Sequence, residues 1–144
     1  MLYFDSSYIV KCYVVEPGSA AVLELAQSAP GLASSVLGRV EFRSAIHRHV
    51  RENKLTPGAA GQVFQRMTED ERAGVWSWLP LSSSLTELVC TKYEHLAPSV
   101  FLRSFDAIHL ACAAENGFAE IYSNDNHLLN AAHLFGIAGK NVIV

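Results

Sequence analysis

Short strand-like runs alternate with helical segments along this chain, and that alternation limits its fold more than any other feature. Strand character occurs at residues 2–4, 32–33, 75–79, 120–123 and 141–144. Between these runs the apolar residues have helical spacing, and serine, threonine or proline marks most of the helix starts. Strands that alternate with helices are typical of α/β proteins, in which crossover helices cover a mostly parallel sheet. We therefore expect an α/β sandwich with a mostly parallel central sheet.

Length and composition predict a single domain over residues 1–144. Of the 144 residues, 50% are hydrophobic and 17% are charged, which is enough apolar material for one core. The net charge of −3 is small, so any surface for nucleic acid would have to be local, and no apolar run is long enough to cross a membrane. Residues 1–15 are interrupted by Asp5 and Lys11, so we do not expect a signal peptide.

The cysteines indicate the redox compartment. Cys12, Cys90 and Cys112 are far apart, odd in number and without a CxxC pair, and each lies in a predicted helix among apolar neighbours. This pattern predicts reduced, buried thiols rather than a disulfide scaffold. We therefore expect a cytoplasmic protein.

Four of the fourteen acidic residues occupy positions that solvation does not explain. Asp5 directly follows the first strand, Asp125 follows a later one, and Asp106 lies in the first turn of a helix that we expect Ser104 to cap. Glu41 falls inside the apolar stripe of the third predicted helix, which consists of Val36, Leu37, Val40 and Ala45. A lone glutamate in a buried stripe would be costly.

Each acid also has a purely structural explanation. Asp5 and Asp125 suit helix N-caps, and Asp106 suits the positive end of a helix dipole. The joint pattern favours one site, because three of the four acids lie where a strand ends or the next helix begins. In α/β sheets, sites form beyond the carboxyl ends of the strands.

A cluster of carboxylates narrows the chemistry. Two of them about 4 Å apart repel by roughly 4 kcal/mol at an effective dielectric constant near 20. A divalent cation removes this conflict, and hard oxygen ligands favour Mg²⁺ or Mn²⁺ over zinc. Mg²⁺ held by few carboxylates prefers a substrate phosphate as a further partner, so the pattern predicts phosphodiester hydrolysis by water that the metal activates.

Four segments resemble a known family in order and spacing. They are YFDSSYIVKCYVVEPGS, SSVLGRVEFRSAI, LRSFDAIHLACA and IYSNDNHLLNAA. Together they resemble the PIN-domain ribonucleases of the VapC type, the toxins of toxin–antitoxin pairs. The resemblance spans essentially the whole chain, and it implies a PIN-like three-layer sandwich with the activity of an endoribonuclease.

The resemblance also implies roles for particular residues. It places Mg²⁺ or Mn²⁺, and hence catalysis, at Asp5, Glu41, Asp106 and Asp125, which are the same four acids that their positions single out. Ser6 stands where the family commonly has threonine, and Ser123 matches a threonine or serine two residues before the fourth acid. Both are expected to support the site. Asn126 departs from the charged residue often found there, which leaves the substrate preference open.

The resemblance further implies partners. Toxins of this type are usually homodimers that bind a cognate antitoxin, whose C-terminal segment crosses the active-site groove. The apolar helices at residues 59–67 and 85–96 are candidate surfaces for such contacts, although core packing explains their spacing equally.

The basic residues and histidines near the acids admit two interpretations. Arg43 and Arg103 are close in sequence to site acids, so we expect them to contact RNA or the antitoxin, whereas a solvated helix face is the alternative for Arg48 and Arg51. His109 shares a helix face with Asp106, and the resemblance makes it a packing residue near the site.

Other functions remain open at this stage. A nuclease that acts on DNA or in RNA maturation would share every site residue. A non-catalytic PIN scaffold would be expected to lack one or more of the acids, yet all four are present. Serine-hydrolase chemistry lacks a GxSxG motif.

Overall fold

The sheet of the protein is parallel throughout. The structure is a computed structural model that describes residues 1–144. Its strands are β1 (Leu2–Tyr3), β2 (Leu32–Ser35), β3 (Trp76–Leu79), β4 (Glu120–Tyr122) and β5 (Ala138–Lys140). β2 pairs with both β1 and β3, β4 pairs with β5, and an isolated parallel bridge between Phe4 and Tyr122 joins the two ladders. The strand order is therefore 3-2-1-4-5, and the predicted parallel sheet is confirmed.

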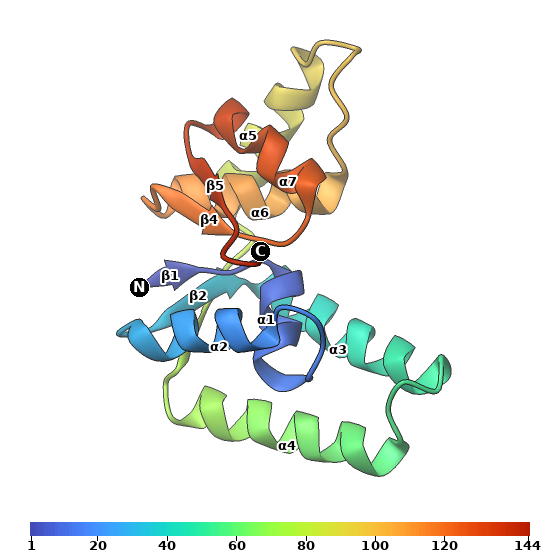
Figure 1. Ribbon diagram of the computed structural model, residues 1–144. Helices are drawn as coiled ribbons and strands as arrows, with labels where there is room; N and C mark the ends of the chain where they lie inside the picture. Colours follow the sequence, from blue (N-terminus) through green and yellow to red (C-terminus); the bar gives the residue numbers. More distant parts are fainter.

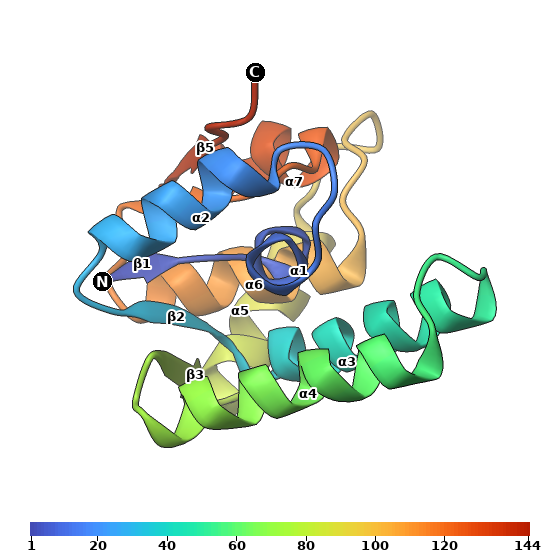
Figure 2. The same cartoon turned by 60° about the horizontal axis from the view of Figure 1, so that its bottom comes forward.

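Helices cover both sides of this sheet, as the prediction of a layered α/β fold requires. They are α1 (Ser6–Tyr13), α2 (Ser19–Ser28), α3 (Val36–Arg51), α4 (Pro57–Arg72), α5 (Ser83–Glu94), α6 (Ser104–Glu115) and α7 (Asn126–Ala131), with the 3₁₀ helix η1 (Ala132–Phe135). α1 to α4 lie below β1 and β2 in Figure 1, and α5 to α7 lie above them. Figure 2 shows α1 nearly end-on, between α2 on one side and α3 and α4 on the other. None of these helices combines the length and the apolar character that a bilayer crossing requires.

The strand β1 divides the core into two parts. Tyr3 belongs to a cluster of buried side chains from α5, α6, α7 and β4, whereas Phe4 belongs to a second cluster built mainly from α1, α3 and α4. Successive side chains of a strand point to opposite faces, so neighbouring residues anchor the two helical layers. Both rings are fully buried. This double burial explains why the first strand is apolar without alternation.

Short polar residues determine where most helices begin. Asp5, Ser35, Thr56, Ser82 and Asp125 each cap a helix by accepting a hydrogen bond from a backbone N–H of its first turn. α2 and α6 are the exceptions. α2 begins after Gly18, which has no side chain that could cap it. α6 lacks a side-chain cap as well. Its first residue is Ser104 and its cap position is Arg103, with no side-chain capping bond, so the predicted Ser104 cap is wrong. The side chain of Arg103 instead donates hydrogen bonds to Asp106 and Asp125.

The last strand and the buried face of α3 differ from the prediction. Residues 141–144 form no strand, and the last strand is β5, which ends at Lys140. The buried face of α3 consists of Gly38, Phe42 and Ile46, and Val40 is 64% exposed, because this helix packs through the face that contains its glycine.

The cysteines also differ from the prediction. All three are free thiols, but Cys112 alone is fully buried. Cys12 is half-buried and Cys90 is exposed on α5. Apolar neighbours in a helix showed that each cysteine lies in a partly apolar segment, but they did not show whether the cysteine itself faces the core or the solvent.

Candidate active site

The site lies where the strand order of the sheet reverses direction. From β1 the chain proceeds to β2 on one side, whereas β4 occupies the other side through the Phe4–Tyr122 bridge. The backbone N–H of Asp5 donates to the carbonyl oxygen of Tyr122 at 3.1 Å, so the carboxyl ends of β1 and β4 meet. Loops diverge at such a switch point and leave a crevice, which is where α/β sheets bind ligands.

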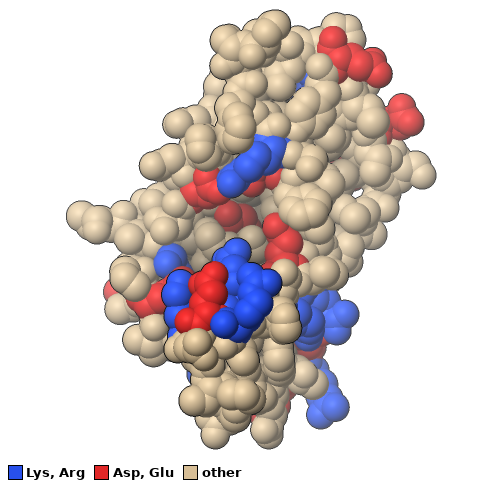
Figure 3. All heavy atoms as spheres, turned by 90° about the vertical axis from the view of Figure 1, so that its right-hand side faces the viewer, with Lys and Arg blue, Asp and Glu red and all other residues tan.

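A cavity of about 270 Å³ occupies this crevice and brings the four predicted acids together. It is lined by Asp5, Ser6, Ser7, Glu41, Arg103, Ser104, Phe105, Asp106, His109 and Asp125. Figure 3 shows acidic side chains inside a hollow near the middle of one face, with lysine or arginine side chains along its borders above and below. The acids come from four separate segments, so the tertiary fold alone makes them neighbours.

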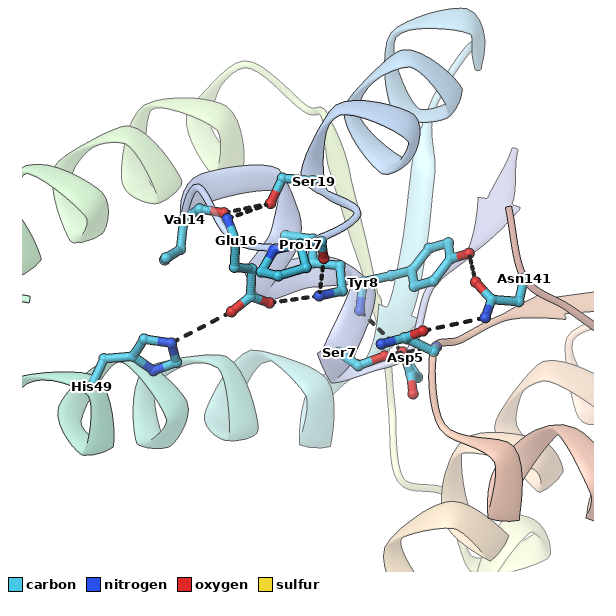
Figure 4. A network of polar contacts seen from close by, with 11 residues as sticks. Asp5, Ser7, Tyr8, Val14, Glu16, Pro17, Ser19, His49 and Asn141 are labelled. Carbon is cyan, nitrogen blue, oxygen red and sulfur yellow. Dashed lines mark hydrogen bonds and ion pairs between the residues drawn. The ribbon is translucent and has the colours of Figure 1, made fainter. Parts of the chain in front are cut away.

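Asp5 is the most deeply buried acid of the cavity. It is only 4% exposed, and its carboxylate accepts hydrogen bonds from Ser7 Oγ at 2.6 Å, from Ser123 Oγ at 2.5 Å and from the N–H of Tyr8 at 3.1 Å. Figure 4 shows Asp5 and Ser7 at the start of α1. Burial raises the pKa of Asp5, although nearby His109 and the two hydroxyl groups oppose this. Asp5 is thus both an N-cap and a buried carboxylate without a bonded cation.

The two serines predicted to support the site take different places. Ser6 lines the cavity beside Asp5, as the first residue of α1. Ser123 is fully buried behind Asp5, and besides donating to that carboxylate it accepts a hydrogen bond from the N–H of Asp125 at 2.9 Å. Ser123 therefore ties two of the acids to each other.

His109 holds Glu41 in the cavity. Its Nε2 lies 2.6 Å from Glu41 Oε1, and its Nδ1 lies 2.9 Å from the hydroxyl of Tyr3. The same hydroxyl accepts a hydrogen bond from the N–H of Ser35. His109 is 2% exposed, so the ring is fixed at both ends. The prediction that His109 only packs near the site was therefore incomplete. Its position one helical turn after Asp106 was the feature of the sequence that indicated a place at the site.

A close approach of two helices makes this contact possible. A Cβ atom on Gly38 would lie 2.4 Å from Ser34 Oγ, 3.1 Å from Ile9 Cδ1 and 3.3 Å from His109 Cε1. Gly38 precedes Glu41 by about one helical turn, on the same side of α3. The absence of a side chain at Gly38 therefore gives the His109 ring the room to reach Glu41.

Arg103 bridges the remaining two acids. Its Nε donates to Asp106 Oδ2 at 2.7 Å, and its Nη2 donates to Asp125 Oδ2. Burial raises the pKa of Asp106 even though Arg103 opposes the shift. The pKa of Asp125 is lowered: burial alone would raise it, but the hydrogen bonds from Arg103 and from the N–H of His127 outweigh that effect.

The structure places Arg43 away from the acids. Arg43 donates to Glu71 Oε1 at 2.8 Å and to the carbonyl oxygen of Arg39, and it does not line the cavity. Arg39 binds the same Glu71 carboxylate. Closeness in sequence to Glu41 did not indicate this, because α3 directs the two side chains toward different neighbours.

The donor set fits a hard divalent cation by its chemistry. All four acids supply oxygen, and Asp5 is a buried carboxylate that only neutral donors satisfy. As the side chains stand, no three groups are arranged to hold a metal ion. Arg103 accounts for much of this, since its guanidinium group lies between Asp106 and Asp125. A cation that used the Oδ2 atoms of these two acids would have to displace Arg103.

Comparisons with known proteins agree with this architecture. Ribonuclease VapC45 of Mycobacterium tuberculosis (strain CDC 1551 / Oshkosh) is 33% identical over 117 residues, which cover 81% of this chain and 77% of the relative. The crystal structure of Mycobacterium tuberculosis VapC20, a sarcin-ricin loop cleaving toxin, superposes with a TM-score of 0.69 at 17% identity, covering 91% of this chain and 95% of VapC20.

A complex gives a similar result. VapBC2 from Rickettsia felis, solved bound to a DNA fragment from its promoter, matches with a TM-score of 0.67 at 14% identity, covering 98% of each chain. At such identities the structural matches show the fold alone. The family model described as PIN domain matches residues 2–134, which include all four cavity acids. By sequence and by fold, this chain belongs to the PIN domain family.

Proposed function

We propose that this protein is a VapC-type endoribonuclease that hydrolyses RNA phosphodiester bonds with Mg²⁺ or Mn²⁺ held by Asp5, Glu41, Asp106 and Asp125. One observation carries the proposal: four carboxylates from separate segments line one cavity at the switch point of a PIN fold. The ribonuclease relative supports RNA as the substrate. We also propose that residues 1–144 act as one domain, since the Phe4–Tyr122 bridge connects the two ladders of the sheet.

The mechanism follows from how the chain holds these acids. Asp5, Glu41, Asp106 and Asp125 would hold the Mg²⁺ or Mn²⁺ ion, which would supply Lewis-acid chemistry for phosphoryl oxygens and for water near neutral pH. Asp5 is held in position by Ser7 and Ser123, and Glu41 by His109, so neither carboxylate must reorganise to bind a cation. Ser6 lines the same cavity, where its hydroxyl can orient water.

Arg103 has a second role in this mechanism. Once its ion pairs with Asp106 and Asp125 open, the Arg103 guanidinium group would be free at the border of the cavity. Arginine binds phosphate through paired hydrogen bonds, so Arg103 is suited to the RNA backbone next to the cleaved bond. It is equally suited to a carboxylate of an antitoxin. For Arg43, a contact of this kind stays a prediction that would require its ion pair with Glu71 to open.

We propose a cognate antitoxin as the protein partner and a homodimer as the assembly. The VapBC2 complex supports a partner of this kind. Residues 59–67 in α4 and 85–96 around α5 are the surfaces that we assign to these contacts. We place the protein in the cytoplasm, because its three cysteines are free thiols. Light scattering of the protein alone, and with the product of an adjacent antitoxin-like gene, measures both assemblies.

The test of the activity is a cleavage assay. Wild-type protein, Asp5→Asn and Asp106→Asn are incubated with defined single-stranded and structured RNAs, and with DNA of the same sequence, in Mg²⁺, Mn²⁺ or chelator. We expect the wild type to cleave RNA only with a cation. Because metal-ion catalysis contributes several kcal/mol, each variant should be at least roughly 100-fold slower.

Controls separate chemistry from folding. Glu24→Gln removes an exposed acid of α2 and should cleave like the wild type, and circular dichroism should show all the variants to be folded. Cleavage that persists in chelator would reject the metal mechanism. Cleavage of DNA with RNA left intact would assign the protein to the alternative class of PIN nucleases that act on DNA.

A further inference from the structure

Two exposed phenylalanine rings lie close in sequence to Arg103, and one of them, Phe105, lines the acid cavity. Phe105 is 54% exposed and Phe101 is 60% exposed, and they flank Arg103 in the segment that leads into α6. Phe105 is the one hydrophobic residue among the ten that line the cavity. The ring of Phe101 lies against His127, with a centroid distance of 4.6 Å and an interplanar angle of 56°.

Core packing does not explain the position of Phe105. Its neighbours Asp106 and Ala107 on α6 are buried, whereas Phe105 projects into a wall that is otherwise polar. Single exposed apolar side chains are common on protein surfaces. Here, however, the ring stands directly beside the acids that would bind the cleaved phosphate. Any nucleotide whose phosphate enters the cavity brings its base within reach of this wall.

From this arrangement we infer that Phe105 is a stacking platform for an unpaired nucleobase next to the cleaved phosphate, and that Phe101 with His127 receives a neighbouring base. The inference rests on the proposed function and narrows its substrate to single-stranded RNA. A base in a duplex stacks on its neighbours and presents only its edge, whereas an unpaired base exposes a face that an aromatic ring can cover.

The order of aromatic and cationic side chains favours a nucleic-acid occupant over a protein segment. Arg103 lies between the two phenylalanines in sequence, and its side chain is 46% exposed at the cavity border. Aromatic rings alternating with a cation match a strand in which bases alternate with phosphates. His127 adds a second ring beside Phe101 and is itself exposed. The three aromatic side chains come from two segments that each contribute residues to the cavity: Phe101 and Phe105 flank Arg103, and His127 lies two residues after Asp125.

The test measures binding and cleavage separately. Single-stranded RNAs with 2-aminopurine at successive positions are titrated with wild-type protein and with Asp5→Asn in Mn²⁺, and anisotropy and base fluorescence are recorded. The substitutions are Phe105→Ala, Phe105→Leu and Phe105→Trp, with Leu81→Ala as a matched control, because Leu81 is an exposed apolar side chain that does not line the cavity.

The expected result depends on the aromatic face. Phe105→Ala and Phe105→Leu should both weaken binding of single-stranded RNA by about 5- to 150-fold, because stacking on an aromatic side chain contributes an effect of that order. Phe105→Trp should restore binding, Leu81→Ala should be neutral, and 2-aminopurine at one position should be quenched by the wild type but not by Phe105→Leu. Alanine and leucine are good helix formers, so α6 should stay intact.

Other results would reject the stacking platform or assign the rings to another partner. If Phe105→Leu binds RNA like the wild type, or if the wild type binds no single-stranded RNA, the stacking platform is rejected. If Phe105→Ala leaves RNA binding unchanged but weakens antitoxin binding, the rings belong to a protein interface instead. Quenching without cleavage would retain the platform and reject the proposed activity, so failure of one can be told from failure of the other.

Discussion

Arg103 is predicted to compete with the divalent cation for the site. Its side chain bridges the Oδ2 atoms of Asp106 and Asp125, so a cation bound through these two atoms must first displace it. In Arg103→Gln this competition is removed. The two carboxylates then repel each other in the metal-free protein, whereas the metal-bound protein loses no contact between Arg103 and these acids. The variant should therefore be less stable without metal and should bind metal more tightly.

The magnitude follows from the exposure of the ion pairs. Arg103 is 46% exposed, so each pair is treated as a solvent-screened surface pair that contributes about 0.2–1 kcal/mol. Together the two pairs stabilise the metal-free protein by about 1 kcal/mol. For a chain of this size, the loss lowers Tm by roughly 3–5 °C in chelator. The same free energy no longer opposes metal binding, which raises the Mn²⁺ affinity by about fivefold.

Differential scanning fluorimetry in chelator and calorimetric titration with Mn²⁺ measure the two effects. Arg43→Gln is the matched control: it removes an ion pair with Glu71 outside the cavity, so it should lower Tm without changing the Mn²⁺ affinity. Unchanged or weaker Mn²⁺ binding by Arg103→Gln would refute the competition, whatever the change in stability.

Three further predictions concern the acids and their supports. Burial raises the pKa of Asp5, so folding favours its protonated form, and the stability that this form provides is lost as the pH rises through the raised pKa. In chelator, Asp5→Asn should therefore have a higher Tm than the wild type at neutral pH, and the difference should shrink on acidification; a difference that is the same at every pH would contradict this. His109→Gln loosens Glu41 and should reduce Mn²⁺ affinity or activity by about 10- to 100-fold, as loss of a residue that orients a metal ligand does; near-normal values would assign His109 to packing alone. Gly38→Ala should destabilise the protein by about 1–3 kcal/mol in denaturant titration, because its Cβ would lie 2.4 Å from Ser34 Oγ, whereas Gly61→Ala, with nothing within 4 Å, should be neutral or stabilising; similar effects of the two substitutions would show that this contact relaxes without cost.

Local patterns in the chain predicted most of the elements. Thr56 followed by Pro57 marked the start of α4, and strand-like runs located β1, β2, β3 and β4 to within about two residues. These signals are readable because capping and side-chain periodicity act over a few residues. The same signals missed β5, whose three residues Ala138–Lys140 include a glycine and little β propensity. The sheet supplies the reason for β5, since it pairs with β4.

In the candidate site too, some features follow from local sequence patterns and others follow only from the tertiary fold. Asp5 and Asp125 were singled out by the joint pattern of acids at strand ends, because each of them alone also suits a helix N-cap, and both do cap a helix. Glu41 was assigned for a partly mistaken reason, since the stripe that included Val40 is not the buried face of α3. The buried face of α3 includes Gly38. Because glycine has no side chain, the hydrophobic pattern of the sequence did not indicate that this face is buried.

The amino-acid sequence by itself determined the types of the main elements and the starts of most helices, and it singled out the four acids that the fold brings into one cavity. The tertiary structure decided that His109 orients Glu41, that Arg103 joins Asp106 to Asp125, and that Arg43 binds Glu71 instead of the cavity. Periodicity records which face of a helix is apolar, but it does not record which helix will cover that face. Partners such as Glu41 and His109, 68 positions apart, are set by packing across the whole sheet.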